Sequence, residues 1–199
     1  MHISEGVLSG GVLIAGWAGT LTGISIGLKK SDPDKIVRTA LISSAFFLAS
    51  LVNIKIGPSS THLSLIAPIG LILGYEVFPA VFVALLLQSL LFHFGGILVL
   101  GANTFTMAFS GLMTYIIFGK LIFKNDNKKF TALISFMAGS FAVIFAAFLT
   151  GLLLYLSDES FINAIKILFF AHIPVALIEG IVTAFLVLWL KKAAPEFLA

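Results

Sequence analysis

The chain begins with Met-His-Ile-Ser-Glu-Gly, and the histidine at position 2 is one of only four in 199 residues. A histidine at this position can chelate a metal ion in a way that an internal histidine cannot. The α-amine of Met1, the backbone nitrogen of His2 and the Nδ1 atom of its imidazole can close two fused rings on one ion. Because the backbone nitrogen must lose its proton, the metal has to favour square-planar nitrogen ligation, as Ni(II) and Cu(II) do.

A fourth nitrogen would complete this site, and His62 is the first choice. It ends a Gly/Pro/Ser-rich stretch, GPSSTHLS, which we expect to form an outer loop leading into a helix. The residues alone leave alternatives open. His2 can be a terminal residue without a role, and His62 can be a helix-start histidine that bonds to the backbone.

The other two histidines fit a structural or supporting role better than a ligand role. His93 lies between two phenylalanines, and His172 lies close to Pro174. Histidines that bind metal usually donate their second ring nitrogen to a carboxylate or a carbonyl group. Side chains that could support the ligands in this way are Glu5, Asn53, Asn103 and Gln88.

Glu179 is a carboxylate inside a long apolar segment, and such a residue is functional by default. It follows His172 by seven residues, so both share a helix face about 10 Å apart along the axis and cannot touch. The alternative is a protonated glutamate that a neighbouring helix satisfies.

The composition of the chain predicts that the protein holding these side chains is an integral membrane protein. Hydrophobic residues make up 59% of the chain and charged residues 11%, and the mean hydropathy is +1.12. A water-soluble domain carries about 25% charged residues. No cysteine is present, so disulfides and zinc–thiolate sites are excluded. The basic balance is typical of cytoplasmic loops rather than of nucleic-acid binding.

Seven apolar segments predict an all-α bundle of seven transmembrane helices in a single domain, 1–199. The segments are 7–28, 39–54, 62–74, 77–92, 105–123, 131–156 and 167–190. No Lys or Arg precedes the first segment, which therefore does not resemble a signal peptide and should stay on the mature protein. Residues 93–104 are glycine-rich, and we expect them to form a re-entrant outer loop folded onto the bundle.

The positions of lysine and arginine predict that the N-terminus lies outside. With seven crossings, only Lys55 and Lys166 fall on the outer side. This asymmetry is a strong positive-inside signal. All four histidines then lie on the outer side. The inner loops and tail hold Lys29, Lys30, Lys35, Arg38, Lys120, Lys124, Lys128, Lys129, Lys191 and Lys192.

Four stretches resemble the CbiM/NikM family, the substrate-specific membrane (S) components of energy-coupling-factor transporters for cobalt and nickel. They are MHISEGVLSG, GPSSTHL, LLFHFGGILVLGANTFTMAFSG and HIPVALIEGIVTAFLV. The resemblance runs from residue 1 to about residue 190 in unchanged order. It implies seven helices with the N-terminus outside. It also implies, as metal ligands, the amine of Met1, the amide nitrogen and side chain of His2, and the side chain of His62.

The chain departs from the family pattern at two places. It reads HFGG from His93 to Gly96 where the family often has GDGG, so His93 can be an auxiliary ligand or a lid residue. It has Thr106 where the family tends to have Asn. These departures leave the metal open between Ni²⁺ and Co²⁺. A planar four-nitrogen site favours Ni²⁺, although such a site binds Cu²⁺ more tightly still.

The chain has no phosphate-binding loop for ATP and is not expected to be an enzyme. The resemblance implies separate ATPase subunits, a membrane coupling (T) subunit and, in some systems, a small accessory membrane subunit, all in the cell (inner) membrane of a bacterium or archaeon. A stripe of small residues could dock such a partner or pack within the bundle. Its members are Gly11, Ala15, Gly19, Gly23 and Gly27. A weaker alternative face is formed by Ala40, Ser44, Ala45 and Ala49.

Two other function classes compete with metal capture. A self-contained transporter could couple metal to protons through Glu179 and His172, but the internal repeats typical of that class are not evident. A membrane hydrolase could use Ser59 or Ser60 with His172, but the motifs of known hydrolases are missing.

Overall fold

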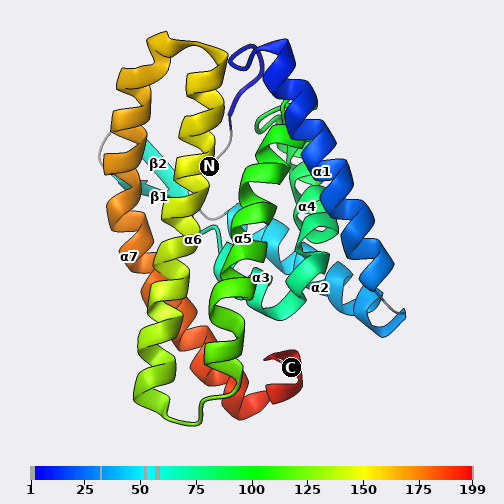
Figure 1. Cartoon of the computed structure of the whole chain (residues 1–199), viewed down its shortest axis with the longest axis vertical. Coiled ribbons are helices and arrows are strands. Elements are labelled where there is room, and N and C mark those ends of the chain that lie inside the picture. Colours follow the sequence, from blue (N-terminus) through cyan, green and yellow to red (C-terminus); the bar gives the residue numbers. More distant parts are fainter. Residues whose placement is uncertain (1–2, 32, 52, 57–58, 199) are drawn as a thin grey trace.

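The computed structural model describes residues 3–31, 33–51, 53–56 and 59–198, and for residues 33, 34, 53–56 and 59–62 it describes the backbone alone. This part of the chain forms α-helices and one antiparallel hairpin (Figure 1). In chain order the elements are α1 (Gly10–Lys30), α2 (Pro33–Ser50), β1 (Asn53–Ile56), β2 (Ser59–His62), α3 (Ile66–Leu73), α4 (Val77–Phe92), α5 (Leu100–Phe123), α6 (Lys128–Ser157) and α7 (Ile162–Ala193). Short 3-10 segments are η1 (Gly74–Glu76), η2 (Glu159–Phe161) and η3 (Pro195–Leu198).

Each of the seven predicted apolar segments overlaps an α-helix of the structure. Within the described residues, five helical stretches are long and apolar enough to cross a membrane. They are Gly10–Lys30, Ile66–Phe92, Leu100–Phe123, Lys128–Ser157 and Glu159–Ala193. The chain is therefore a multi-pass helical membrane protein. Seven separate crossings and an outer N-terminus stay predictions, because α2 is not among these five and α3 and α4 share one of them.

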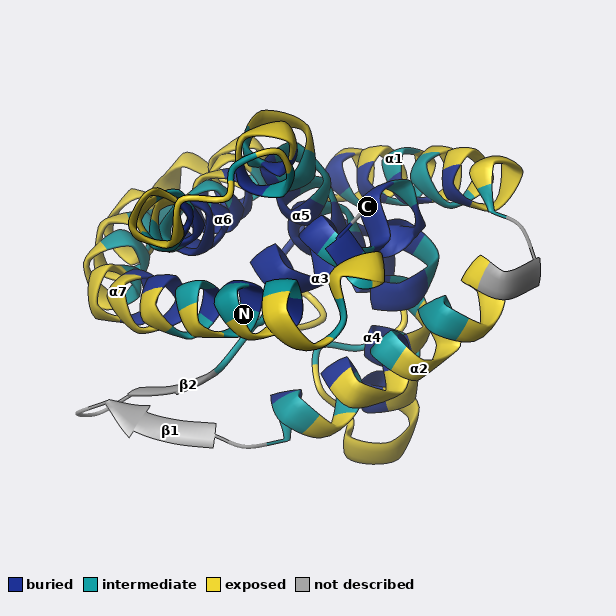
Figure 2. Cartoon of the chain, turned by 90° about the horizontal axis from the view of Figure 1, so that it is seen from below, coloured by how far each residue is buried: buried dark blue, intermediate teal, exposed yellow. Residues whose placement is uncertain are grey.

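All residues of the short helix α3 except Ile72 are buried, and its ribbon is largely dark in Figure 2. It has eight residues, which correspond to a length of about 12 Å. It packs closely on α5, where a Cβ atom at Gly70 would lie 2.2 Å from the carbonyl oxygen of Gly111. A helix that is apolar all round belongs inside a bundle, and this burial places the start of α3 among the other helices.

Helices α6 and α7 approach each other at two glycines. A Cβ atom at Gly139 would lie 2.6 Å from the carbonyl oxygen of Glu179. A Cβ atom at Gly180 would lie 2.6 Å from the Oγ atom of Ser140. Since both glycines face the partner helix, the two backbones come nearly into contact, as small residues allow in membranes. This close pairing of α6 and α7 fixes the position of Glu179 along the bundle.

The stripe of small residues on α1 packs largely within the chain itself. Gly19 faces the ring of Phe105, and Gly23 faces the ring of Phe78. The N-terminal end of the stripe is open, since nothing lies within 4 Å of a Cβ atom at Gly11. Of the two expectations for this stripe, the structure therefore supports packing inside the bundle for its C-terminal half.

Two predicted boundaries are wrong. Residues 53–56 and 59–62 pair as strands, with Asn53 opposite His62, so His62 ends a strand and does not begin a helix. Residues 100–104 belong to α5 and are not part of the loop. The close packing of Gly101 against Trp17, 2.6 Å from a Cβ atom at the glycine, explains why this small residue lies in a helix. The remaining loop, 93–99, contains the positive φ angles of His93, Gly95 and Gly96.

Basic side chains gather at one end of the bundle. Lys191 Nζ donates to the carbonyl oxygen of Ile122 at 2.7 Å, which joins the ends of α7 and α5. The guanidinium of Arg38 donates to the carbonyl oxygen of Phe197 in η3, which joins α2 to the C-terminal tail. Loop 93–99 and the start of α5 lie at the opposite end (Figure 1). We call these two ends the basic end and the loop end.

Candidate metal-binding site

The predicted ligands fall largely outside the described residues. Met1 and His2 lie beyond them, and for His62 only the backbone in β2 is described. Its backbone is paired with that of Asn53, a predicted supporting residue whose side chain is likewise not described. What the structure does describe is how the residues immediately following His2 and His62 are held.

Ile3 is fixed by a two-way hydrogen-bonded pair with Asn103. The backbone N–H of Ile3 donates to Oδ1 of Asn103 at 2.9 Å, and Nδ2 of Asn103 donates to the carbonyl oxygen of Ile3 at 3.0 Å. Both residues are buried, with 7% of Ile3 and 3% of Asn103 exposed. Asn103 sits in the first turn of α5, whose burial sets the position of its amide. The amide thus holds the residue directly after His2 as a neighbouring strand would.

Ser64 and Leu65 are fixed by the carboxylate of Glu179. The backbone N–H of Leu65 lies 3.1 Å from Oε1 and 3.2 Å from Oε2, and the N–H of Ser64 also donates to Oε1. Leu65 precedes the first residue of α3 and has the left-handed angle φ 47°. The carboxylate therefore faces the N-terminus of α3, where the helix dipole favours negative charge. Glu179 is 1% exposed. Its hydrogen bonds to the backbone N–H groups of Ser64 and Leu65 explain how its carboxylate can be buried inside the bundle.

Glu5 joins the N-terminal segment to loop 93–99. Its Oε1 atom accepts from the N–H of Leu98 at 3.0 Å, and its own N–H donates to the carbonyl oxygen of Gly95 at 3.2 Å. Gly96 has φ +123°, and a Cβ atom there would lie 2.3 Å from the side chain of Glu5. Trp17 adds a bond from Nε1 to the carbonyl oxygen of Leu98 at 3.1 Å. The first residues are therefore held on two sides, by Asn103 and by this loop.

His93 and His172 have separate structural partners. His93 is exposed and ends α4 with φ 57°, and its backbone N–H donates to the carbonyl oxygen of Ser89 at 3.1 Å. The Nδ1 atom of His172 lies 2.7 Å from the carbonyl oxygen of Leu168, one turn earlier in α7. Within the described part of the chain, no three His, Asp or Glu side chains form a group that could hold a metal ion. A ligand set made of His93, His172 and Glu179 is therefore not supported.

Gln88 secures the entrance to the hairpin. It is 1% exposed, and its Nε2 atom donates to the hydroxyl of Ser50, the last residue of α2. Because β1 begins three residues later at Asn53, this bond holds the chain just before the hairpin. We did not predict Ser50 from the sequence, nor the backbone N–H groups of Ser64 and Leu65, since a backbone donor has no side-chain signature.

The fold and these contacts define a multi-helix membrane protein. Two of its segments, which follow the predicted ligands His2 and His62, are held by Asn103 and Glu179. Residues 2–197 match the family described as the cobalt uptake substrate-specific transmembrane region, CbiM. The chain belongs to this CbiM family. It is thus a substrate-specific transmembrane component of cobalt or nickel uptake, as the resemblance of its sequence motifs predicted, and the family is one of transport components rather than enzymes.

Relatives match along nearly the whole chain. A Haemophilus influenzae protein, whose name marks it as a candidate metal transport protein, is 36% identical, covering 98% of this chain and 96% of the relative. The cobalt transport protein CbiM of Clostridioides difficile is 34% identical, covering 92% and 79%. A crystal structure described as a truncated transition metal transporter superposes with a TM-score of 0.77 at 26% identity, covering 96% and 99%.

Proposed function

We propose that this chain captures Ni²⁺ or Co²⁺ at the outer face of the cell membrane, with four nitrogens as ligands. They are the amine of Met1, the backbone nitrogen and imidazole of His2, and the imidazole of His62. We further propose that the chain is a single domain over residues 1–199, that it lies in the inner membrane of a bacterium or archaeon, and that its N-terminus faces outward. The placement of the basic side chains at the end opposite loop 93–99 supports this orientation.

The observation that carries the site is the anchoring of the two ligand-bearing segments. Asn103 fixes Ile3, one residue after His2, and Glu179 fixes Ser64, two residues after His62. Two residues of chain span at most about 7 Å, so each proposed ligand is tied within that reach of a buried helix side chain. Groups that bond directly to a metal ligand typically change metal affinity by about 10–100-fold when they are removed, and we expect that range as the upper bound for these anchors.

When the metal ion binds, nitrogen ligands of the protein replace its water ligands, and these nitrogens must first lose their protons. The backbone nitrogen of His2 is the most demanding of these, and only a metal that prefers planar nitrogen ligation compensates for its deprotonation. We therefore favour Ni²⁺ over Co²⁺ as cargo. A relative from Rhodobacter capsulatus, 29% identical, is named as a fused nickel transport protein, NikMN.

Energy for delivery comes, in this proposal, from separate ATPase subunits through a membrane coupling subunit, with a small accessory membrane subunit in some assemblies. A self-contained proton-coupled transporter built on Glu179 and His172 is less well supported. Both side chains already bond to backbone groups, Glu179 to Leu65 and His172 to Leu168.

The test is a titration of the purified protein with Ni²⁺ and Co²⁺ beside a variant that carries one alanine between Met1 and His2. The native protein should bind one ion with the absorbance of a planar nitrogen site. The inserted residue should abolish tight binding, because the fused rings no longer close. Equal binding by the two proteins would exclude the terminal site and require ligands elsewhere.

A further inference from the structure

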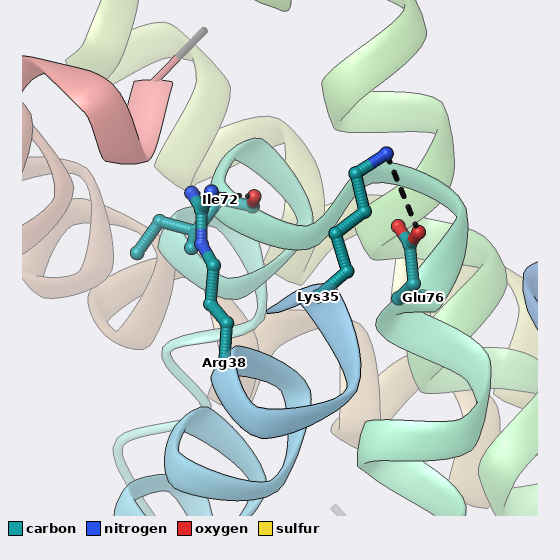
Figure 3. A network of polar contacts seen from close by, with 4 residues as sticks. All are labelled: Lys35, Arg38, Ile72 and Glu76. Atoms are coloured by element: carbon teal, nitrogen blue, oxygen red, sulfur yellow. Dashed lines mark hydrogen bonds and ion pairs between the residues drawn. The ribbon is translucent and has the colours of Figure 1, made fainter. Parts of the chain in front are cut away.

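A polar cavity lies at the basic end of the bundle, at the C-terminal end of α3. It has a volume of about 140 Å³ and lies between the ends of α1, α2 and α3. Three cationic side chains and one carboxylate line it: Lys30, Lys35, Arg38 and Glu76. Figure 3 shows Lys35 and Arg38 rising side by side from α2 toward the turn between α3 and α4.

Three buried polar atoms in this cavity have no hydrogen-bond partner among the described residues. Lys35 Nζ and Glu76 Oε1 form an ion pair at 3.9 Å, which is too long for a hydrogen bond. Glu76 is 7% exposed. Among the described residues, no donor lies within hydrogen-bond distance of its Oε1 atom, and the buried Thr39 hydroxyl and Arg38 Nε also have no such partner. Since buried polar groups are normally satisfied, the cavity offers a free acceptor beside fixed positive charges.

An apolar groove continues from the same cavity along α2 and α4. Its volume is about 290 Å³, and it shares Thr39 and Glu76 with the polar cavity. Ile36 and Leu87 border the groove with 56% and 38% of their surface exposed, so the groove is open at the side of the bundle. A polar cavity joined to an open apolar groove can take a charged headgroup and one acyl chain of the same lipid.

We propose that this cavity and groove bind a phospholipid whose headgroup carries a phosphate and a primary ammonium group, namely phosphatidylethanolamine. The phosphate lies near Lys30, Lys35 and Arg38, as in basic pockets at the cytoplasmic ends of helices. The ammonium donates to Glu76. One acyl chain lies in the groove beside Ile36.

The headgroup chemistry separates this lipid from its competitors. Phosphatidylcholine has the same charges, but its quaternary ammonium has no N–H to donate to Glu76. Phosphatidylglycerol has hydroxyl donors but no positive charge opposite the carboxylate. A metal ion alone is disfavoured, because cationic side chains outnumber carboxylates among the described residues that line the cavity and like charges repel.

Native mass spectrometry of the full chain tests this proposal. The protein is exposed to equal amounts of phosphatidylethanolamine, phosphatidylcholine and phosphatidylglycerol with identical acyl chains. We expect one phosphatidylethanolamine retained about tenfold over phosphatidylcholine, because a hydrogen bond between charged groups is lost with the latter. Glu76→Gln should remove this preference, whereas Glu159→Gln, an exposed glutamate on η2, should keep it. Equal retention of all three lipids, or an unchanged preference in Glu76→Gln, would overturn the proposal.

A second variant tests the groove without changing the charges. Ala40 lines the groove and is exposed on α2, whereas Ala45 is exposed on α2 but does not line it. Ala40→Phe should fill the groove and abolish retention of phosphatidylethanolamine, and Ala45→Phe should not. Nickel titration of each variant reports whether the bundle remains folded, so loss of lipid with retained metal binding supports the proposal. Retained lipid in Ala40→Phe contradicts it.

Discussion

Asn103 and Ile3 exchange two hydrogen bonds across 100 residues of chain, at 2.9 Å and 3.0 Å. A side-chain amide here replaces the backbone of a neighbouring strand. It orders a segment that otherwise frays, since the first residues of most chains are poorly held. The residue directly after His2 therefore has a fixed place in the bundle.

Asn103→Ala should weaken Ni²⁺ binding by at most about 10–100-fold, the range for loss of a group that bonds directly to a ligand. The helical fold should persist, because the change affects one buried pair. Calorimetric titration measures the affinity. Asn127→Ala is the matched control, since Asn127 caps the N-terminus of α6 at the basic end. It should lower stability by about 1 kcal/mol and leave metal binding unchanged. Equal affinities in the wild type and Asn103→Ala would show that the Ile3 pair does not position the ligands.

Glu179→Ala should weaken metal binding more than Glu179→Gln does. Glutamine keeps one carbonyl acceptor for the N–H groups of Ser64 and Leu65, whereas alanine leaves both donors unpaired in the bundle. Titration with Ni²⁺ gives the order of affinities. Glu76→Gln, a change in another buried glutamate at the basic end, should bind Ni²⁺ as the wild type does. If Glu179→Ala binds normally, the hairpin does not depend on this carboxylate.

His62→Ala should lower the affinity for Ni²⁺ sharply by removing the fourth nitrogen. His172→Ala should have little effect, because the Nδ1 atom of His172 is already bonded to the carbonyl oxygen of Leu168. The absorbance of the Ni²⁺ complex compares the two variants. A planar-type spectrum that is lost in His172→Ala but kept in His62→Ala would reverse the assignment of the ligand.

Glu5→Ala should loosen loop 93–99 without unfolding the bundle. The N–H of Leu98 loses its acceptor, and the side chain that fills the space beside Gly96 is removed. Hydrogen exchange of the Leu98 amide should become faster, while exchange along α6 stays slow. Glu159→Ala serves as the control for loss of an exposed carboxylate. Unchanged exchange in Glu5→Ala would mean that the remaining contacts, from Trp17 and from the backbone N–H of residue 5, are enough to hold the loop.

Gly139→Ala should destabilise the protein more than Gly151→Ala. The new Cβ atom at Gly139 would lie 2.6 Å from a backbone oxygen of α7, whereas at Gly151 it would lie 3.1 Å from a flexible isoleucine side chain. Overpacking of this kind typically costs about 1–3 kcal/mol. Thermal unfolding in detergent measures the difference. Equal midpoints for the two variants would show that α6 and α7 can separate at little cost.

The sequence predicted the helical segments well, because long apolar runs mark helices regardless of their partners. The prediction was wrong where an apolar run continues past the end of a helix and the chain pairs as strands instead. Residues 53 and 54 end the predicted apolar segment 39–54, so the pairing of 53–56 with 59–62 was not predicted, although the dipeptide Gly57-Pro58 is a turn signal. The length of 39–54 concealed the end of α2 at Ser50.

Some residues that form these contacts were noted in the sequence. Glu5 and Asn103 were expected to support metal-binding histidines, and Glu179 was noted as a carboxylate inside an apolar segment; whether they support a metal site stays a prediction. Their partners were not noted, because the groups they bind are backbone groups of Ile3, Leu98 and Leu65. Every residue carries such groups, so only the folded chain reveals which of them are used.

The contact between Glu179 and Ser64 joins residues 115 positions apart in the chain. During synthesis, the segment around His62 therefore leaves the ribosome long before its anchor on α7 exists, and α3 is too short to insert into the bilayer alone. Asn103 likewise follows Ile3 by 100 residues. Both anchors of the proposed site thus form late, so a truncated or unfinished chain would carry the proposed ligands without the contacts that hold the neighbouring residues in place.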